Sequence, residues 1–223
     1  MFYKKYFKRL FDIIISGIAL LLIGWFIILV ALFLYFANKG AGVFFLQERP
    51  GKDGKIFKVI KFKTMTDERD ENGRLLPDAQ RLTKVGRFVR STSIDELPKL
   101  INILKGDMAL IGPRPLLLHY AWVYTDFERR RMEVKPGITG WAQVHGRNLL
   151  KLSKKFELDV CYVDHCSLWL DIKIIWMTIM NVLKRSDIGE GAGNMKDIDD
   201  VNLGQRVQEY RKKMAANIHN ETV

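Results

Sequence analysis

The apolar stretch Ile13–Phe36, IIISGIALLLIGWFIILVALFLYF, decides which folds this 223-residue chain can adopt. None of its residues is charged. As one α-helix it is about 36 Å long, against a hydrocarbon core of about 30 Å. Hydropathy alone therefore indicates a helix that crosses a membrane.

The residues around this stretch favour a different path. Basic residues flank it on both sides, at Lys4, Lys5, Lys8 and Arg9 before it and at Lys39, Arg49, Lys52 and Lys55 after it. Positive flanks mark the cytoplasmic side, so both ends are expected there. Gly17 and Gly24 are weak helix formers inside the stretch. We therefore predict a re-entrant helix, and not a removed signal peptide, because no A-x-A-like cleavage site follows.

The composition points to anionic partners. Lys and Arg number 36 against 25 Asp and Glu, a formal net charge of +11. This balance suits nucleic acid, anionic lipid head groups or phosphorylated substrates. The apolar stretch favours the last two, so we expect no nucleic-acid partner. The two cysteines, Cys161 and Cys166, are too few for a disulfide framework and are expected to be reduced cytosolic thiols.

The remaining patterns predict a mostly helical α+β fold. Val43–Gln47 and Ile56–Phe62 are separated by a turn-rich segment, which is typical of a β-hairpin. Phe156–Lys184 is apolar and periodic but interrupted by charges, which predicts interfacial helices that pack on the domain or lie on the membrane. We expect a membrane-inserted helix at residues 1–40, a small cytosolic catalytic domain at 41–185 and a C-terminal tail at 186–223.

Two adjacent carboxylates stand in the segment SIDELP, residues 93–98. A helix is predicted to begin at Ser93 and to end at Gly106. Ser93 and Glu96 have the spacing of a capping box, which would explain the acids structurally. A helix start also receives anions, so a phosphate held beside Asp95 and Glu96 is the alternative. The spacing alone leaves both interpretations open.

Several basic residues are candidates for phosphate contacts. In Gly112–Pro115, two prolines fix the backbone around Arg114, and arginine binds phosphate oxygens in a bidentate fork. Arg147 follows a turn-rich loop, Lys61 lies on the second predicted strand, and Arg90 lies on a basic helical face. A surface turn and a solvated basic face are the structural alternatives.

Seven ordered motifs carry a resemblance to a known family. They are KRLFD (8–12), QERPG (47–51), KFKTM (61–65), SIDELP (93–98), LKGDM (104–108), GPRP (112–115) and PGITGWAQV (136–144). From about Lys8 to Lys184 the chain resembles the monotopic bacterial phosphoglycosyl transferases, also called bacterial sugar transferases. It is similar to the minimal members, such as those that transfer phospho-N,N′-diacetylbacillosamine. Two places depart from the family pattern: Gly24-Trp25 replaces a common Ser-Pro, and His145 replaces a common Asn.

The resemblance implies a reaction and a location. A UDP-sugar gives its sugar-1-phosphate to a polyprenyl phosphate, usually undecaprenyl phosphate, and UMP is released. The product starts a membrane-linked glycan. The family requires Mg²⁺ and works at the cytoplasmic face of the bacterial inner membrane, on a re-entrant helix. Membrane lipids are therefore expected partners, and a second copy of the chain and downstream glycosyltransferases are further candidates.

The resemblance also suggests residue roles. Asp95 is the expected nucleophile, which would form an aspartyl-phosphosugar before polyprenyl phosphate attacks. Asp95 and Glu96 are the expected Mg²⁺ ligands, and proton handling is the other role open to Glu96. The expected phosphate contacts are Arg114, Arg90, Arg147 and Lys61. Two rivals remain, a membrane-tethered scaffold that binds anionic lipid or nucleic acid, and a lipid-phosphate phosphatase with an aspartyl nucleophile.

Overall fold

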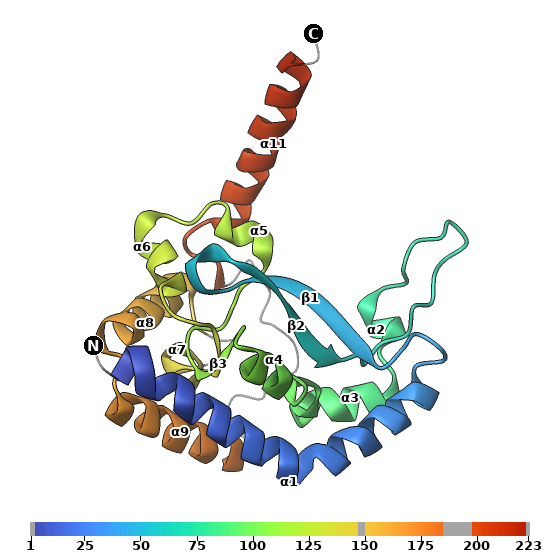
Figure 1. The fold of residues 1–223 in the computed structure, drawn as a ribbon. Coiled ribbons are helices and arrows are strands. Elements are labelled where there is room, and N and C mark those ends of the chain that lie inside the picture. The colour runs from blue at the N-terminus through green and yellow to red at the C-terminus, as the bar shows by residue number, and fades with distance from the viewer. Residues whose placement is uncertain (1–2, 147–149, 185–197, 222–223) are drawn as a thin grey trace. The chain divides into compact units, whose positions relative to one another are not determined.

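The described part of the protein is mostly helical, with two small two-stranded sheets (Figure 1). The computed structural model describes residues 3–146, 150–184 and 198–221. The chain forms two compact units. The first unit, called the dyad unit because it holds the carboxylate pair Asp95 and Glu96, contains Tyr6–Gln47 and Lys58–Met108. The second, called the C-terminal unit, contains Met1–Lys5, Glu48–Phe57 and Ala109–Val223.

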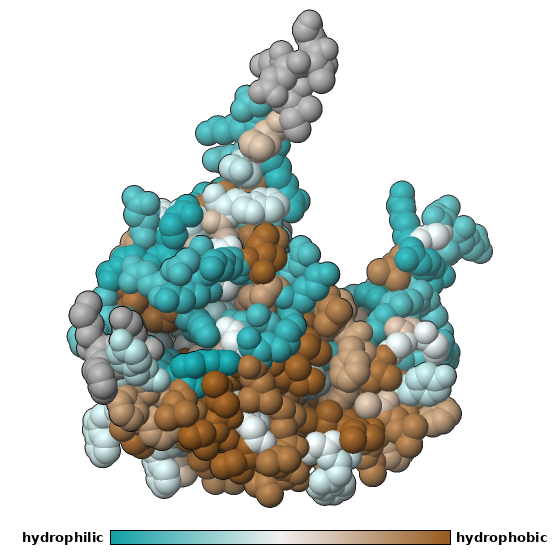
Figure 2. All heavy atoms as spheres, viewed as in Figure 1, coloured by the Kyte–Doolittle hydropathy of each residue, from teal (hydrophilic) through white to brown (hydrophobic). Residues whose placement is uncertain are grey.

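The longest helix of the dyad unit is α1, Lys8–Ala37, which follows the π-helical turn η1, Tyr3–Phe7. In the part of the chain that the structure describes, it is the one helix long and apolar enough to cross a membrane. It is a continuous helix that bends along its length (Figure 1). Leu21, Leu22 and Trp25 are exposed, and apolar side chains cover much of its surface (Figure 2). The predicted apolar helix is confirmed, and its re-entrant path stays a prediction.

The other side of α1 packs inside the dyad unit. Ile27, Val30 and Leu34 form a core cluster with Phe62 and Val89. This cluster joins α1 to the strand β2, Ile56–Phe62, and to the helix α3, Lys84–Ser91. Burial of such side chains contributes about 1.5–3 kcal/mol each and fixes α1 against the unit.

At the other end of α1, Arg9 contacts the end of α4, Lys99–Lys105. Its Nη1 donates to the Ile103 carbonyl at 2.5 Å, and its Nη2 donates to the Leu104 carbonyl at 2.9 Å. The last carbonyls of a helix lack partners within the helix, and a cation there also complements the helix dipole. Arg9 thus ties α1 to α4.

The predicted hairpin is confirmed. Its strands are β1, Phe44–Pro50, and β2, Ile56–Phe62, joined through the 3₁₀ turn η2, Lys52–Gly54. The other elements of the dyad unit, besides α1 and α4, are α2 (Asp78–Arg81), α3 (Lys84–Ser91) and η3 (Ile94–Glu96). The buried Asn102 side chain joins α4 to β2, because it donates to the Lys58 carbonyl at 2.8 Å and accepts from the Ile60 amide at 2.9 Å.

The C-terminal unit surrounds a short parallel sheet. The strands β3, Ala109–Ile111, and β4, Gly137–Thr139, pair with Ala109 opposite Gly137. A Cβ at Gly137 would lie 2.1 Å from the Gly112 nitrogen, so the close approach after β3 requires glycine. The helical elements are α5 (Leu118–Ala121), α6 (Asp126–Arg129), η4 (Arg130–Met132), α7 (Trp141–Val144), α8 (Leu152–His165), α9 (Leu168–Leu183) and α11 (Leu203–Glu221).

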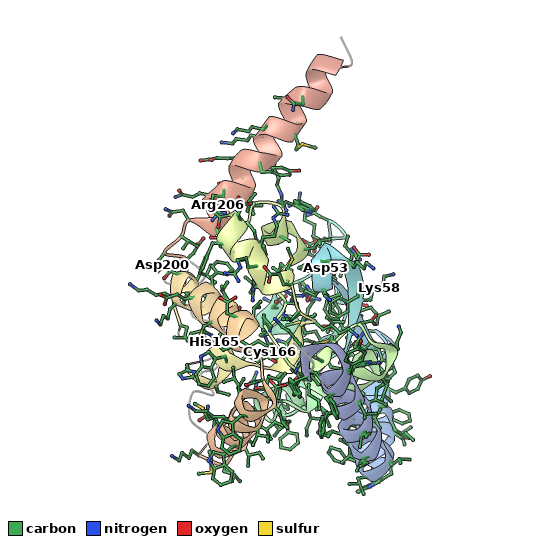
Figure 3. All side chains as sticks on the ribbon, turned by 60° about the vertical axis from the view of Figure 1, so that its left-hand side comes forward. Asp53, Lys58, His165, Cys166, Asp200 and Arg206 are labelled. Carbon is green, nitrogen blue, oxygen red and sulfur yellow. The ribbon has the colours of Figure 1, made fainter. Side chains whose placement is uncertain are left out.

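The periodic stretch Phe156–Lys184 divides into the end of α8 and α9. Figure 3 labels His165 and Cys166 where α8 ends, and Ser167 caps α9 through the Leu170 amide at 3.3 Å. The buried Ile174 holds α9 in the core, whereas Trp169 and Trp176 are exposed. This division agrees with the prediction of amphipathic helices that pack on the domain.

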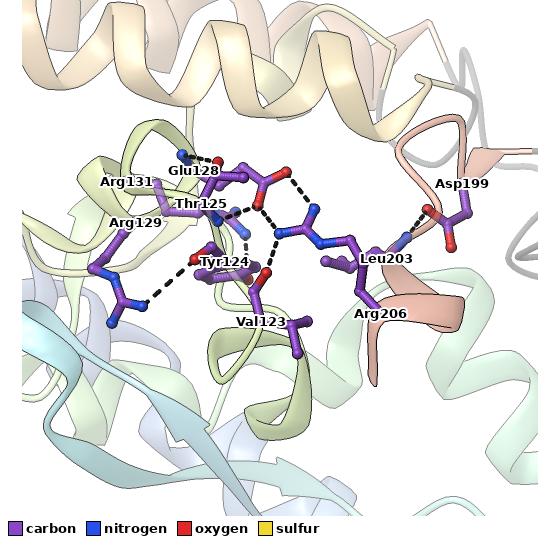
Figure 4. Close-up of polar contacts among 9 residues, drawn as sticks. All are labelled: Val123, Tyr124, Thr125, Glu128, Arg129, Arg131, Asp199, Leu203 and Arg206. Atoms are coloured by element: carbon purple, nitrogen blue, oxygen red, sulfur yellow. Dashed lines mark hydrogen bonds and ion pairs between the residues drawn. The ribbon is translucent and has the colours of Figure 1, made fainter. Parts of the chain in front are cut away.

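The helix α11 is attached to the C-terminal unit at its first turns (Figure 4). Leu203 and Val207 are buried in a cluster with side chains of α5 and α8. Arg206 donates to both carboxylate oxygens of Glu128, at 2.9 and 2.8 Å, and to the Val123 carbonyl. The tail predicted after residue 185 therefore contains a docked helix.

Candidate active site

The segment that carries the two carboxylates is not the start of a long helix. Ser93 has φ 58°, in the left-handed region, and its side chain makes no capping hydrogen bond. The turn η3 covers Ile94–Glu96, and α4 begins only at Lys99. The predicted capping box is therefore wrong, because the left-handed backbone at Ser93 differs from the extended backbone that directs an N-cap side chain to the amides of the first turn. Capping does not explain Glu96.

Glu96 is instead engaged by two lysines. The same oxygen, Oε1, lies 2.9 Å from Lys99 Nζ and 3.3 Å from Lys61 Nζ. Lys61 comes from β2 and Lys99 from the first position of α4, so two elements meet at one carboxylate. The structure thus brings the predicted Lys61 to the carboxylates. Lys99 was missed by the sequence reasoning, although its i,i+3 spacing from Glu96 was a usable signal.

Asp95 lies beside Glu96 in a partly buried position. Burial raises the pKa of the Asp95 carboxyl, and the neighbouring negative charge of Glu96 raises it further. The charges of Lys61, Lys99 and Arg90 act in the opposite direction. Arg90 is held by Thr64, to whose Oγ1 its Nε donates at 2.8 Å. The arrangement places two carboxylates among three cations, which favours anionic ligands such as phosphate.

In the C-terminal unit, the Gly112–Pro115 turn is held by two other arginines. Arg131 Nη2 donates to the Arg114 carbonyl at 2.7 Å, and Arg49 Nη1 donates to the Pro115 carbonyl at 3.2 Å. Burial, together with the charge of Arg114, lowers the pKa of Arg49 to about 10. The sequence reasoning selected Arg114 but missed Arg49 and Arg131. Arg147 lies outside the described residues.

The donor atoms of the dyad suit Mg²⁺. This ion prefers carboxylate oxygens and usually keeps water or substrate phosphate in its other positions. Over residues 3–146, 150–184 and 198–221 there is no group of three or more His, Cys, Asp and Glu that could enclose a metal ion. Asp95 and Glu96 therefore fit an ion that is completed by a substrate, and not an all-protein cage.

Comparison with known proteins assigns the family. The sequence profile of the family described as "Bacterial sugar transferase" matches residues 3–185. The chain belongs to the bacterial sugar transferase family. The predicted family and enzyme class, a sugar transferase, are thereby confirmed. The match ends before α11, so the docked C-terminal helix lies outside the family region.

Individual relatives agree with this assignment. The chain is 56% identical over 176 residues to the uncharacterized sugar transferase EpsL of Bacillus subtilis, covering 79% of this chain and 87% of that protein. It is 42% identical over 183 residues to the UDP-glucose:undecaprenyl-phosphate glucose-1-phosphate transferase of Klebsiella pneumoniae. The Escherichia coli protein of the same name is 40% identical over 188 residues. These two matches cover 78% and 79% of this chain but 39% and 40% of the relatives.

Proposed function

We propose that this protein transfers sugar-1-phosphate from a UDP-sugar to polyprenyl phosphate, with release of UMP, as the first membrane step of glycan assembly. The names of the Klebsiella and Escherichia relatives support the substrate class. The observation that carries the proposal is the carboxylate pair Asp95 and Glu96 set among Lys61, Lys99 and Arg90. Both substrates are anions. The three cations would reduce the repulsion between these substrates and the two carboxylates.

Asp95 is the proposed nucleophile. Its carboxylate oxygen attacks the phosphorus that carries the sugar, and the bond from this phosphorus to the oxygen of UMP breaks. UMP leaves with the bonding electron pair, and an aspartyl-phosphosugar remains. An oxygen of polyprenyl phosphate then attacks the same phosphorus and releases the Asp95 carboxylate. Lys61 and Arg90 are the proposed phosphate contacts in the dyad unit.

Asp95 and Glu96 would also hold Mg²⁺, which supplies charge neutralisation for the diphosphate when it is bound. Glu96 is fixed by its two lysines, so it would orient the pair. The proposed role of Arg114 as a phosphate contact rests on the family motif.

We propose that the reaction takes place at the cytoplasmic face of the bacterial inner membrane, with α1 re-entrant. The bend in α1 supports this path (Figure 1). Cysteines introduced at Tyr6 and Lys39, in a background with Cys161→Ser and Cys166→Ser, should resist an impermeant thiol reagent in intact cells. Labelling of the Tyr6 site from outside would show a spanning helix. Gly24→Leu should favour that spanning form, because no atom lies within 4 Å of the added Cβ and leucine stiffens the helix.

A donor screen tests the reaction itself. The purified protein in detergent, with Mg²⁺ and undecaprenyl phosphate, is offered UDP-glucose, UDP-galactose, UDP-N-acetylglucosamine and UDP-N,N′-diacetylbacillosamine. We expect UMP release with at least one of them. A scaffold would release no UMP, and a lipid-phosphate phosphatase would release inorganic phosphate from the lipid and ignore the UDP-sugars.

A further inference from the structure

Lys99 is a buried cation and, of the three cations around the carboxylates, the one that the proposed function does not assign to a phosphate. Its side chain is 5% exposed and lies 2.9 Å from Glu96 Oε1. Lysine is almost never buried unless its charge is paired. An ammonium taken out of water loses its hydration, and only a close anion offsets that loss. The pairing of Lys99 with Glu96 is therefore a condition of its burial.

The two lysines at Glu96 differ in their access to water. Lys61 is 22% exposed and can exchange its contact with Glu96 for one with a bound phosphate. Lys99 projects from the first residue of α4, three positions after Glu96. Its short connection to the carboxylate holds the Glu96 side chain from the protein interior.

We propose that Lys99 is a positioning residue of the phosphoryl-transfer site, which fixes the Glu96 carboxylate and offsets part of its negative charge, so that less repulsion meets the diphosphate that approaches Asp95. This inference rests on the proposed function. Without Lys99, the Glu96 carboxylate is free to turn. Of the two lysines at this carboxylate, only Lys61 then offsets its charge. Both changes disfavour the approach of a diphosphate to Asp95.

Lys99→Met tests this role, because methionine preserves the length and the packing of the side chain and removes the charge. Lys99→Gln is a second variant that keeps a hydrogen-bond donor. Lys105→Met is the matched control, since Lys105 ends the same helix and its side chain is 60% exposed. All variants are first compared with the wild type by melting temperature in detergent.

The measurement is a single turnover, with enzyme in saturating excess over the radiolabelled UDP-sugar that the screen selects and with undecaprenyl phosphate present. Its rate constant does not depend on the fraction of folded molecules, so a purely structural role of Lys99 would not change it. We expect both Lys99 variants to be slowed by roughly tenfold to hundredfold, the cost typical of a misplaced reacting group. Lys105→Met should keep the wild-type rate constant.

Two results would overturn the inference. A wild-type rate constant in Lys99→Met would show that Lys99 only packs, whatever its melting temperature. Slowing in Lys99→Met but not in Lys99→Gln would replace charge neutralisation by a hydrogen-bonding role. A wild-type protein that releases no UMP from any donor would instead overturn the proposed function, and this inference with it.

Discussion

The two units of this protein each contain charged side chains withdrawn from water, and they use them differently. In the C-terminal unit, Arg131 and Asp159 form an ion pair at 2.6 Å with side chains 3% and 1% exposed. In the dyad unit, Glu96 is 18% exposed beside Lys61 and Lys99. The Arg131–Asp159 pair is sealed by protein, whereas the Glu96 carboxylate keeps contact with solvent.

The sealed pair also has its remaining partners inside the protein. Arg131 donates to the Tyr124 hydroxyl at 3.1 Å and to the Arg114 carbonyl, and its guanidinium lies over the Phe156 ring at 5.2 Å from the centroid. Such a network holds a fold together. The comparison teaches that burial of charge does not by itself mark a reactive site, because a pair sealed by protein offers no atom to a ligand.

The largest expected effect is the loss of activity in Asp95→Asn. The substitution keeps the shape of the side chain but removes the nucleophile, so transfer should be abolished while the melting temperature changes little. Wild type given a UDP-sugar and Mg²⁺ without lipid should release about one UMP per active site. The peptide that contains Asp95 should then gain the mass of a phosphosugar.

Glu96→Gln serves as the comparison and should be severely impaired, with a trace of the first half-reaction retained. Ping-pong kinetics are expected with both substrates. Strictly sequential kinetics, with no UMP until lipid is added, would instead support direct attack by polyprenyl phosphate.

The next effect concerns stability in the C-terminal unit. Asp159→Asn leaves Arg131 without its buried counter-charge and should lower the free energy of unfolding by about 3–5 kcal/mol. Chemical unfolding in detergent, followed by tryptophan fluorescence, measures it. The double variant Arg131→Met/Asp159→Leu should recover part of the loss, because it leaves neither charge buried alone. If Glu96→Gln lowered the free energy of unfolding by as much, the sealed charges of the C-terminal unit and the solvent-accessible charges of the dyad unit would not differ in their structural role.

A smaller effect is expected at Arg114. If its guanidinium binds phosphate in a fork, Arg114→Lys supplies one point donor and should lose a charge-assisted hydrogen bond. That loss is about 1.5–3 kcal/mol, which corresponds to roughly tenfold to hundredfold in kcat/KM. Lys84→Met, on the basic face of α3, is the control and should stay near wild type. Near-normal turnover of folded Arg114→Lys would assign Arg114 to the turn alone.

The smallest effect concerns α11. Arg206→Gln should weaken its docking by about 1 kcal/mol, because the ion pair with Glu128 is partly exposed. Limited proteolysis of α11 should become faster, and transfer activity should not change. Slower or unchanged proteolysis would show that Leu203 and Val207 carry the docking alone.

The ion pair between Arg206 and Glu128 also makes the docking of α11 dependent on pH. Burial acts to raise the pKa of Glu128, but hydrogen bonds from Arg206 and from the Thr125 amide outweigh it, so the pKa lies below its usual 4.5. A lowered folded-state pKa contributes stability that is fully present above pH 4.5 and is lost as the pH falls through the lowered value. Proteolysis of wild-type α11 with an acid-active protease should therefore accelerate below this pH, and that of Arg206→Gln should change less.

The sequence predicted the elements whose signal is local. The apolar composition of α1 and the turn between β1 and β2 are properties of neighbouring residues, and both were predicted. The left-handed backbone at Ser93 was not predicted, because a Ser-x-x-Glu sequence occurs both where a capped helix begins and where it does not. The sealed pair of Arg131 and Asp159 joins residues distant in sequence, and no spacing rule indicates such a pair.

For the candidate site, the motifs supplied Asp95 and Glu96 but not the side chains around them. Lys61 was selected as a phosphate contact, and its position beside Glu96 depends on how β2 packs against α4. That packing includes the buried Asn102, whose side chain bonds to the β2 backbone. Such tertiary contacts decide which cations meet at a carboxylate, and a single sequence does not show them.

The contact between Arg9 and the end of α4 has a mechanical consequence. α4 is a rod of 7 residues, about 10 Å long, with the carboxylates just before one end and Arg9 bound at the other. If α1 lies in a bilayer as proposed, a change in bilayer thickness that alters the tilt or depth of α1 would pull on the end of α4 through the Arg9 guanidinium. The geometry around Asp95 would then depend on bilayer thickness, and turnover should vary with the acyl-chain length of the surrounding lipid.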